Sequence, residues 1–508
     1  MNRNLVQSLL AIVVLIILLE LAQHFITAPP VESPNPTIVY VTATPAPNRP
    51  EQPESSPGDP LFDALDPSLL GTIAHSSFPE RLININGILF FNAKNADTGR
   101  ELWQSNGTPE GTRLVKDIKP GPASSFPEPL ALANGNLFFK AGDGTNSSGL
   151  WLSDGTSNGT RLVKNIQPAA NAPAIQKPIH FGGRLFLGAT DGDTGQELWQ
   201  SDGTAAGTVL VKDIKPGAGD STPANFTLMN DTLYFSADNR VNGSELWRSD
   251  GTAAGTTLVK DIFPDFAGSN ITEIIAVNDL LYFNAFIPNI GSELWRSDGT
   301  TEGTQLITDI VPGLGSSSPS LLTGLNGIVL FKADDRITGS ELWRSDGSPQ
   351  GTFLVKDIYP GPEASLPKDL IAINDILFFT ADDGKSGREL WRSNGAPQGT
   401  FLVKDIRAGP SSSEPSGLTN LNDVLFFNAH DGSTGRELWR SDGTPQGTFL
   451  VKDIFPGLEE SNPAELTPVD NLLFFRALEP ATGWELWRSD GSPEGTKLVK
   501  DIWPNSTQ

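Results

Sequence analysis

Apolar residues along this chain fall into short runs separated by turn-forming residues. Around Trp391, candidate strands cover residues 369–373, 376–381, 388–393 and 400–406, bounded by Gly, Pro, Asn or Asp. Runs of this length between such residues are typical of β-strands, and no segment carries an amphipathic helical period of useful length. The pattern therefore predicts four strands joined as an antiparallel meander.

The same pattern recurs nine times at a spacing of 48 residues, without insertion or deletion. Each copy contains Glu-Leu-Trp followed by Asp-Gly-Thr, with few substitutions. A fixed period of this kind indicates identical supersecondary units that stack on one another. The nine motif tryptophans are Trp103, Trp151, Trp199, Trp247, Trp295, Trp343, Trp391, Trp439 and Trp487.

A two-residue turn separates the first and second predicted strands in every copy. Asn, Asp and Gly tolerate positive φ, as a type I′ hairpin turn requires. We therefore predict nine tight hairpins at one offset. The turns are Asn86-Gly87, Asn134-Gly135, Gly182-Gly183, Asn230-Asp231, Asn278-Asp279, Asn326-Gly327, Asn374-Asp375, Asn422-Asp423 and Asp470-Asn471.

The second and fourth strands are apolar on successive residues, as in 377–379 and 401–403, so both of their faces are covered. A four-stranded meander packed on both faces is a propeller blade, and propeller repeats span roughly 40–50 residues. We predict an all-β propeller of nine four-stranded blades over residues 61–508; an open β-solenoid is the alternative. Because residues 497–502 complete the fourth strand of the last unit, we expect the ring to close without exchanging a strand between the first and last blades. Residues 69–74 are a candidate for an extra strand at this closure.

The N-terminus is predicted to be a transmembrane signal-anchor over residues 1–28. Residues 5–26 are mostly apolar, and Arg3 before them favours a cytoplasmic N-terminus. A cleaved signal peptide is the alternative, although Pro29 disfavours cleavage after Ala28, and a buried core helix is the third interpretation. Either of the first two would place the rest of the chain outside the cytoplasm, on the membrane or secreted.

Residues 29–60 form a predicted disordered linker, rich in Pro, Ser, Thr and Asn. Extended at ~3.1 Å per residue, such a linker would hold a domain roughly 100 Å from the membrane.

Composition narrows the functional classes. The net charge of -24 argues against a nucleic-acid partner, because phosphate binding needs a basic surface. The chain has no cysteine, which excludes disulfides, thiolate metal sites and cysteine nucleophiles. Its histidines are His24, His75, His180 and His430, at unrelated offsets in the repeat, which disfavours a histidine-based metal or catalytic cluster. No cofactor is expected, and the oligomeric state stays open.

At these motifs the chain resembles the bacterial ELWxxDGT repeat proteins. The resemblance rests on Glu-Leu-Trp, Asp-Gly-Thr, Gly-Thr and Leu-Val-x-Asp-Ile at fixed offsets, and it covers residues 78–504. It implies exported bacterial proteins with propeller-like repeats and implies no catalytic residue. Departures include Gly149 for the motif glutamate, Asn165 for the fourth-strand aspartate, and Asn106 and Asn394 at the turn aspartate.

The repeated residues have structural and functional interpretations. Tryptophans at one mid-strand offset are expected in the core, with a sugar-stacking surface as the alternative. The turn aspartates either cap their turns or bind calcium, and the tolerated Asn106 and Asn394 favour capping. These aspartates are Asp154, Asp202, Asp250, Asp298, Asp346, Asp442 and Asp490.

A symmetric turn between the third and fourth strands would place opposite charges across the strand pair. We predict Glu389 opposite Lys404 and Glu437 opposite Lys452, at about 0.2–1 kcal/mol per pair. The fifth copy would be the exception, with Thr308 in place of lysine.

The acidic loops before each tryptophan vary between copies and are expected to share one rim with the long Pro/Gly/Ser loops. Varied loops on a constant scaffold are where binding usually resides. They include residues 191–195, 334–336, 382–384 and 430–432. Asp191, Asp193, Asp382 and Asp383 are the candidate metal ligands, although solvated turns without a ligand are the simpler interpretation.

We therefore expect a membrane-tethered, extracytoplasmic, non-enzymatic binding module with a protein or carbohydrate partner at the loop rim. One alternative is an extracellular glycan hydrolase or lyase that uses carboxylates such as Asp193, Asp335 or Asp383. Another is a purely structural surface protein. No single carboxylate breaks the repeat, which favours binding over catalysis.

Overall fold

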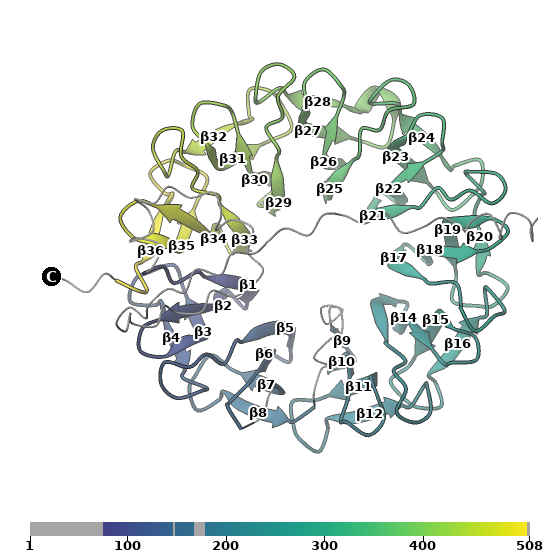
Figure 1. Ribbon diagram of the computed structural model, residues 1–508, viewed down its shortest axis with the longest axis horizontal. Coiled ribbons are helices and arrows are strands. Elements are labelled where there is room, and N and C mark those ends of the chain that lie inside the picture. The colour runs from purple at the N-terminus through teal and green to yellow at the C-terminus, as the bar shows by residue number, and fades with distance from the viewer. Residues whose placement is uncertain (1–74, 146–147, 167–177, 505–508) are drawn as a thin grey trace, which may run out of the picture. The chain divides into compact units, whose positions relative to one another are not determined.

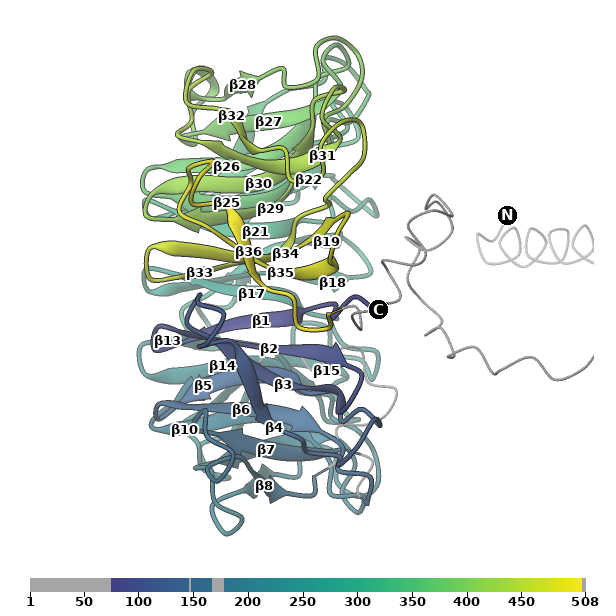
Figure 2. The same cartoon turned by 90° about the vertical axis from the view of Figure 1, so that its left-hand side faces the viewer.

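Nine four-stranded antiparallel sheets make up the described part of the chain. The computed structural model describes residues 75–145, 148–166 and 178–504. In every sheet the strands are ordered as in the sequence, from first to fourth. The sheets are arranged as blades of a ring, with each first strand nearest the axis and each fourth strand outside (Figure 1). Seen from the side, the strands run between the two faces of the ring, and the loops lie at the two rims (Figure 2).

Blades are numbered here from β1–β4 (blade 1) to β33–β36 (blade 9). The first strands are β1 (Glu80–Ile85), β5 (Glu128–Ala133), β9 (Ile179–Phe181), β13 (Ala224–Met229), β17 (Thr272–Val277), β21 (Ser320–Leu325), β25 (Lys368–Ile373), β29 (Ser416–Leu421) and β33 (Ala464–Val469). The second strands are β2 (Ile88–Asn95), β6 (Asn136–Ala141), β10 (Arg184–Ala189), β14 (Thr232–Asp238), β18 (Leu280–Ile287), β22 (Ile328–Asp334), β26 (Ile376–Asp382), β30 (Val424–His430) and β34 (Leu472–Glu479).

The third strands are β3 (Gly99–Ser105), β7 (Gly149–Ser153), β11 (Glu197–Ser201), β15 (Ser244–Ser249), β19 (Gly291–Ser297), β23 (Ser340–Ser345), β27 (Arg388–Ser393), β31 (Arg436–Ser441) and β35 (Gly483–Ser489). The fourth strands are β4 (Arg113–Lys116), β8 (Arg161–Lys164), β12 (Val209–Lys212), β16 (Thr257–Lys260), β20 (Gln305–Leu306), β24 (Phe353–Lys356), β28 (Phe401–Lys404), β32 (Phe449–Lys452) and β36 (Lys497–Lys500). A short 3₁₀ turn, η3 (Pro397–Gly399), interrupts the β structure of blade 7.

The predicted hairpins between first and second strands are present in all nine blades. In blade 1, Ile85 pairs with Ile88 across the turn, and Asn86 and Gly87 have φ of 52° and 81°. The first turn residue has positive φ throughout the ring. At Asn278-Asp279, Asn374-Asp375 and Asp470-Asn471 the second residue does not, so the type I′ prediction applies to the other six turns.

A β-bulge between third and fourth strands overturns the predicted Glu–Lys pairs. In blade 7 the bulge falls between Leu390 and Trp391, and it places Lys404 opposite Leu390 instead of Glu389. The Lys404 ammonium then donates to the carbonyl of Thr448 in blade 8 at 2.7 Å. The glutamate is buried inside, so the predicted cross-strand ion pair is wrong, and Glu437 and Lys452 are separated by the same bulge.

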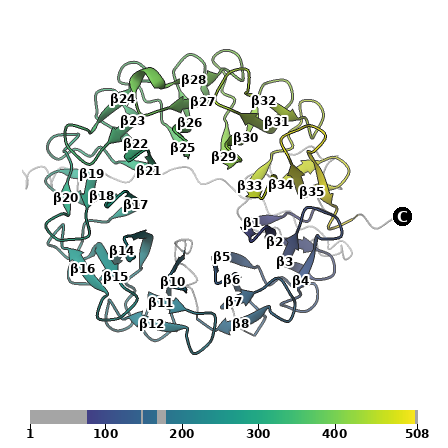
Figure 3. The same ribbon diagram turned by 180° about the vertical axis from the view of Figure 1, so that it is seen from behind.

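The core lies between blades, and it closes the ring. Nine clusters join side chains of one blade to the second strand and motif tryptophan of the next, as in Phe378, Val403, Phe427 and Trp439. The same set is formed between blades 9 and 1. Lys500 of blade 9 donates to Thr112 of blade 1 at 2.8 Å, as its equivalents do elsewhere. The ring is therefore a closed nine-bladed propeller, without strand exchange, and an open solenoid is excluded (Figure 3).

We call the junction between blades 9 and 1 the closing seam. Two tryptophans outside the repeated motif add contacts there. Trp484 is buried with Phe455 and Leu478, and Phe78 of blade 1 stacks on its ring. Trp503 lies against His75, and the Lys94 ammonium is 4.9 Å from its ring centre. An aromatic cluster at the seam thus adds side-chain contacts to the inter-blade core.

Charged side chains add a further seam contact. The Glu80 carboxylate lies 3.2 Å from Arg100 of its own blade and 3.1 Å from Arg476 of blade 9. Because both arginines are largely buried, one carboxylate bridging them compensates part of the cost of removing their charges from water.

The predicted signal-anchor, the linker and the candidate clasping strand 69–74 lie outside the described residues. Within residues 75–145, 148–166 and 178–504, no helix has the length and apolar character needed to cross a membrane.

Candidate functional site

The glutamate of the Glu-Leu-Trp motif fastens each blade to the next one. Glu389 is completely buried, and its carboxylate accepts three hydrogen bonds. Their donors are the Ile406 N–H at 3.0 Å, the Ser413 N–H at 2.8 Å and the Ser413 hydroxyl at 2.6 Å. Because Ser413 precedes the first strand of blade 8, the carboxylate joins two blades.

We call these residues the clamp glutamates and clamp serines. Seven further clamps repeat this contact. The clamp glutamates are Glu101, Glu197, Glu245, Glu293, Glu341, Glu389, Glu437 and Glu485. The clamp serines are Ser125, Ser221, Ser269, Ser317, Ser365, Ser413, Ser461 and, across the closing seam, Ser77.

Burial shifts the acidity of these carboxyls. It raises the pKa of Glu389 to about 7 and that of Glu485 to about 8, although the serine and backbone donors oppose the rise. A raised pKa in a cleft would suggest a catalytic acid. Here all eight groups are buried and equivalent, which is typical of a structural role.

One junction lacks the clamp. Gly149 replaces the glutamate in blade 2, and the sequence has Pro173 at the position of the clamp serine. Leu162 occupies the space, since a Cβ on Gly149 would lie 2.5 Å from its Cδ1. In this blade the Trp151 indole N–H donates to the Ala141 carbonyl at 3.1 Å. Both partners of the pair are thus absent together.

The motif aspartates cap their turns. The Asp442 carboxylate accepts the N–H of Thr444 at 2.8 Å and its hydroxyl at 2.7 Å. These hydrogen bonds lower the pKa of Asp442 from its ordinary value. Asn106 accepts the same two bonds from Thr108, which explains why asparagine is tolerated there. The carboxylates are therefore engaged by their own turns.

The fourth-strand lysine links blades on the outer side of the ring. Lys404 approaches the Trp439 ring of blade 8 to 5.9 Å while it binds the Thr448 carbonyl. In blade 5, where Thr308 replaces the lysine, the corresponding Thr352 is 9% exposed, whereas Thr448 is 0% exposed. The motif tryptophans lie in the inter-blade clusters, between 3% and 9% exposed. The glutamates, turn aspartates, lysines and tryptophans of the motif thus make scaffold contacts.

The loops that vary between copies gather on one rim. In the eight blades whose incoming connection is described, the loop after the second strand is hydrogen bonded to that connection, for example by the Asp334 N–H to the Ser317 carbonyl at 3.0 Å. We call this edge the loop rim; in blade 6 it comprises residues 311–319 and 335–339. Residues directly after the clamp serine, such as Ser318 and Glu414, have φ of 49° and 46°. This left-handed residue recurs around the ring, so it belongs to the scaffold.

Three of the four candidate metal ligands, Asp191, Asp382 and Asp383, accept hydrogen bonds from their own loops. The Asp191 carboxylate accepts N–H groups of Asp193 and Thr194 at 3.0 and 3.2 Å. Asp382 and Asp383 accept N–H groups of their own loop in blade 7. Within the described ranges, no group of three His, Asp or Glu side chains has a geometry that would hold a metal ion. The hydrogen bonds of these carboxylates stabilise their loops.

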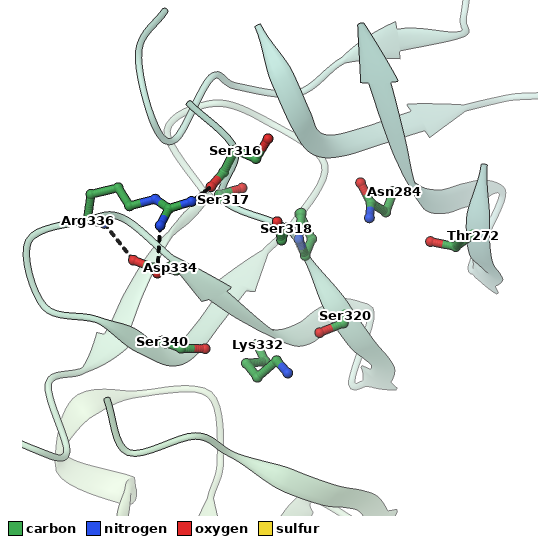
Figure 4. A pocket seen from close by; sticks show the side chains of 11 residues that line it. Thr272, Asn284, Ser316, Ser317, Ser318, Ser320, Lys332, Asp334, Arg336 and Ser340 are labelled. Carbon is green, nitrogen blue, oxygen red and sulfur yellow. Dashed lines mark hydrogen bonds and ion pairs between the residues drawn. The ribbon is translucent and has the colours of Figure 1, made fainter. Parts of the chain in front are cut away.

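A polar pocket of about 380 Å³ opens on the loop rim between blades 5 and 6. Figure 4 shows Lys332 and Ser340 below Ser320, with Asn284 and Thr272 on the opposite side of the opening. Thr272 and Asn284 come from β17 and β18, and the other lining residues come from blade 6. The full lining is Thr272, Asn284, Ser316, Ser317, Ser318, Pro319, Ser320, Lys332, Asp334, Arg336 and Ser340.

A second pocket of about 330 Å³ lies at the equivalent place between blades 7 and 8. Arg388 fills part of it and donates to the Leu366 carbonyl at 2.9 Å. Arg436 donates to the Glu414 carbonyl and to Asn428. The side chains of both arginines in this pocket therefore already have hydrogen-bond partners within the protein.

Sequence reasoning did not find these pockets. The sequence feature that could have indicated the first pocket is the variation at the repeat position of Lys332. This position carries Asn, Lys, Gly, Ser, Thr or Arg in the other blades. Trp484 and Trp503 also depart from the repeat, and both stabilise the seam. The carboxylates considered for catalysis, Asp193, Asp335 and Asp383, belong to different blades, and none lines either pocket.

The fold defines a nine-bladed β-propeller with its sequence variation on one rim. No protein-family model and no curated protein matches the chain. Among solved structures it is similar to the computationally designed Ika8 protein, at 14% identity and a TM-score of 0.40, over 72% of this chain and 96% of that one.

Two further similarities are to enzymes. A prolyl endopeptidase matches at 13% identity and a TM-score of 0.41, and the match spans 71% of this chain but only 55% of the peptidase. The GH74 enzyme of Niastella koreensis matches at 11% identity and a TM-score of 0.33, over 83% and 78% of the two chains. Similarities this low carry no argument about activity.

Proposed function

We propose that this propeller is a non-enzymatic binding module whose ligand docks on the loop rim. The observation that carries the proposal is the pocket between blades 5 and 6, which combines about 380 Å³ with a lining of hydroxyl, amide and charged groups. Concave sites with a few directed polar groups are where proteins usually bind small ligands or the ends of larger ones.

The use of the other polar residues supports binding over catalysis. The clamp glutamates are consumed by inter-blade contacts, and the rim carboxylates Asp191, Asp335 and Asp383 accept N–H groups from their own loops. The pocket contains one carboxylate, Asp334, whereas glycoside hydrolysis generally needs a pair about 5–10 Å apart.

The cellular setting belongs to the same proposal. The apolar segment 1–28 and the Pro-rich segment 29–60 support a tethered, extracytoplasmic rim, and the motif spacing supports membership of the ELWxxDGT repeat proteins. A rim held away from the membrane would present its pocket to glycans or proteins of the cell surface.

A glycan array probed with the full-length protein tests the proposal. Thr272→Trp places an indole at the exposed pocket mouth, and Glu302→Trp places one in the exposed turn after β19, at the opposite rim. We expect ligands that bind the native protein and Glu302→Trp to be lost with Thr272→Trp. Equal binding by both variants, or turnover of a bound glycan, would refute a rim-binding module.

A further inference from the structure

The charge of the pocket between blades 5 and 6 is unbalanced. Its ionisable lining residues are Lys332, Asp334 and Arg336. Arg336 is occupied, because it lies 3.6 Å from the Asp334 carboxylate and donates to the Ser316 carbonyl at 3.2 Å. Among the described residues, no acceptor lies within hydrogen-bond or ion-pair distance of the Lys332 ammonium. The pocket therefore has one uncompensated positive charge, in a protein of net charge -24.

At the repeat position of Lys332, blade 2 has a lysine that is paired with a carboxylate. In blade 2, Lys140 stands across the strand pair from Glu128 and forms an ion pair with it at 3.8 Å. Blade 6 has the same register, but Ser320 stands across from Lys332. The exchange of a carboxylate for a hydroxyl leaves the half-buried Lys332 without a partner.

Further donors surround this ammonium. The Asn284 amide is oriented by the Ser292 hydroxyl, which donates to its oxygen at 2.7 Å. Its NH₂ group and the hydroxyls of Thr272, Ser320 and Ser340 have no protein partner among the described residues, and all line the pocket. Polar groups that lack protein partners in a concave site are available to a ligand.

The lining also restricts the chemistry of that ligand. It contains no aromatic ring and no aliphatic side chain larger than proline, so a neutral sugar would find no face on which to stack. Hydroxyl and amide groups suit a polyhydroxylated ring, and the single free ammonium suits one negative charge. Asp334 would disfavour a dianion such as phosphate.

We propose that this pocket binds a sugar carboxylate, meaning a hexuronate unit of an acidic glycan, with Lys332 as the partner of its carboxylate. This assignment rests on the proposed function and specifies its ligand class. Ser320, Ser340 and Asn284 would bind ring hydroxyls. Because the ion pair sits near the surface, ionic strength would weaken it.

Calorimetric titration of the full-length protein tests the assignment, with trigalacturonate, neutral galactotriose and glucose 6-phosphate as probes. Lys332→Gln removes the free charge, and Lys140→Gln removes the equivalent paired one in blade 2. We expect trigalacturonate to bind in preference to both other probes. We expect about a tenfold or greater loss of its affinity in Lys332→Gln and native affinity in Lys140→Gln.

Several outcomes would overturn the assignment. Equal affinity for trigalacturonate in the native protein and in Lys332→Gln would do so, as would stronger binding of galactotriose or glucose 6-phosphate. If array ligands are lost with Thr272→Trp but not with Lys332→Gln, the rim module stands and the uronate site falls. If Thr272→Trp changes no ligand on the array, the proposed function falls with it.

Discussion

Replacing Glu389 by alanine should loosen the junction between blades 7 and 8. The substitution removes the acceptor of three buried hydrogen bonds, from the Ile406 N–H and from the N–H and hydroxyl of Ser413. A buried donor left without an acceptor costs about 1–3 kcal/mol, and the two amides cannot turn away. Removing the carboxylate also removes its desolvation cost, so we expect a net loss of about 2–5 kcal/mol in the free energy of unfolding.

Urea unfolding, followed by the fluorescence of the tryptophans in the inter-blade clusters, measures this loss. Glu363→Ala is the matched control, because Glu363 is exposed and carries the same charge. Ser413→Ala removes one of the three donors and should cost about 1–2 kcal/mol. In the Glu389→Ala background it should cost much less, because its partner is already absent. If Glu389→Ala lies within about 0.5 kcal/mol of Glu363→Ala, the clamp does not hold the blades together.

Three further outcomes are expected. Burial raises the pKa of Glu389 to about 7 and of Glu485 to about 8, so the folded protein holds protons that the unfolded chain, with an ordinary pKa of 4.5, has released. The stability from these groups is complete below pH 4.5 and is lost as pH rises through 7–8, so Tm by scanning calorimetry should fall between pH 5 and 8.5; a flat profile would contradict this. Trp484→Ser should cost about 3–5 kcal/mol and increase hydrogen exchange first in β1 and β33, whereas exchange spread evenly over the blades would argue against a seam-specific role. Thr308→Lys should add about 0.5–1.5 kcal/mol by supplying the missing bond to the Thr352 carbonyl, and an unchanged urea midpoint would show that the lysine contact is neutral.

The blades were predictable because their causes are local. An Asn-Gly or Asn-Asp pair between two β-rich runs specifies a hairpin wherever it occurs, and nine equal spacings specify nine equal units. Strands apolar on both faces, such as residues 377–379, require neighbours on both faces, which a ring provides. The limits of β25, β26 and β27 in blade 7 therefore agree with the prediction to within one residue, and those of β28 to within two.

The register between the third and fourth strands and the contacts between blades were not predictable from one repeat. The Glu389–Lys404 pair failed because a bulge that shifts the register by one residue leaves no mark in the sequence pattern. The role of the glutamate depends on Ser413, which lies 24 residues away in the next repeat. The pocket at Lys332 likewise depends on Ser320 standing where blade 2 has Glu128. Such a difference becomes informative only when the register of both blades is known.

The inter-blade contacts and the loop rim described above depend on closure of the ring between blades 9 and 1. Closure can be measured by cross-linking introduced cysteines, because the native chain has none. Asn84 of blade 1 donates to the Pro468 carbonyl of blade 9 at 3.1 Å, across 384 residues of sequence. In an Asn84→Cys, Pro468→Cys double variant, a short bismaleimide at high dilution should cross-link the two sites within one molecule. The equivalent internal pair, Ala372→Cys with Asn420→Cys, provides the reference yield. Comparable yields for the two pairs are the predicted result; efficient linking of the internal pair with none between blades 1 and 9 would contradict the closed nine-bladed ring.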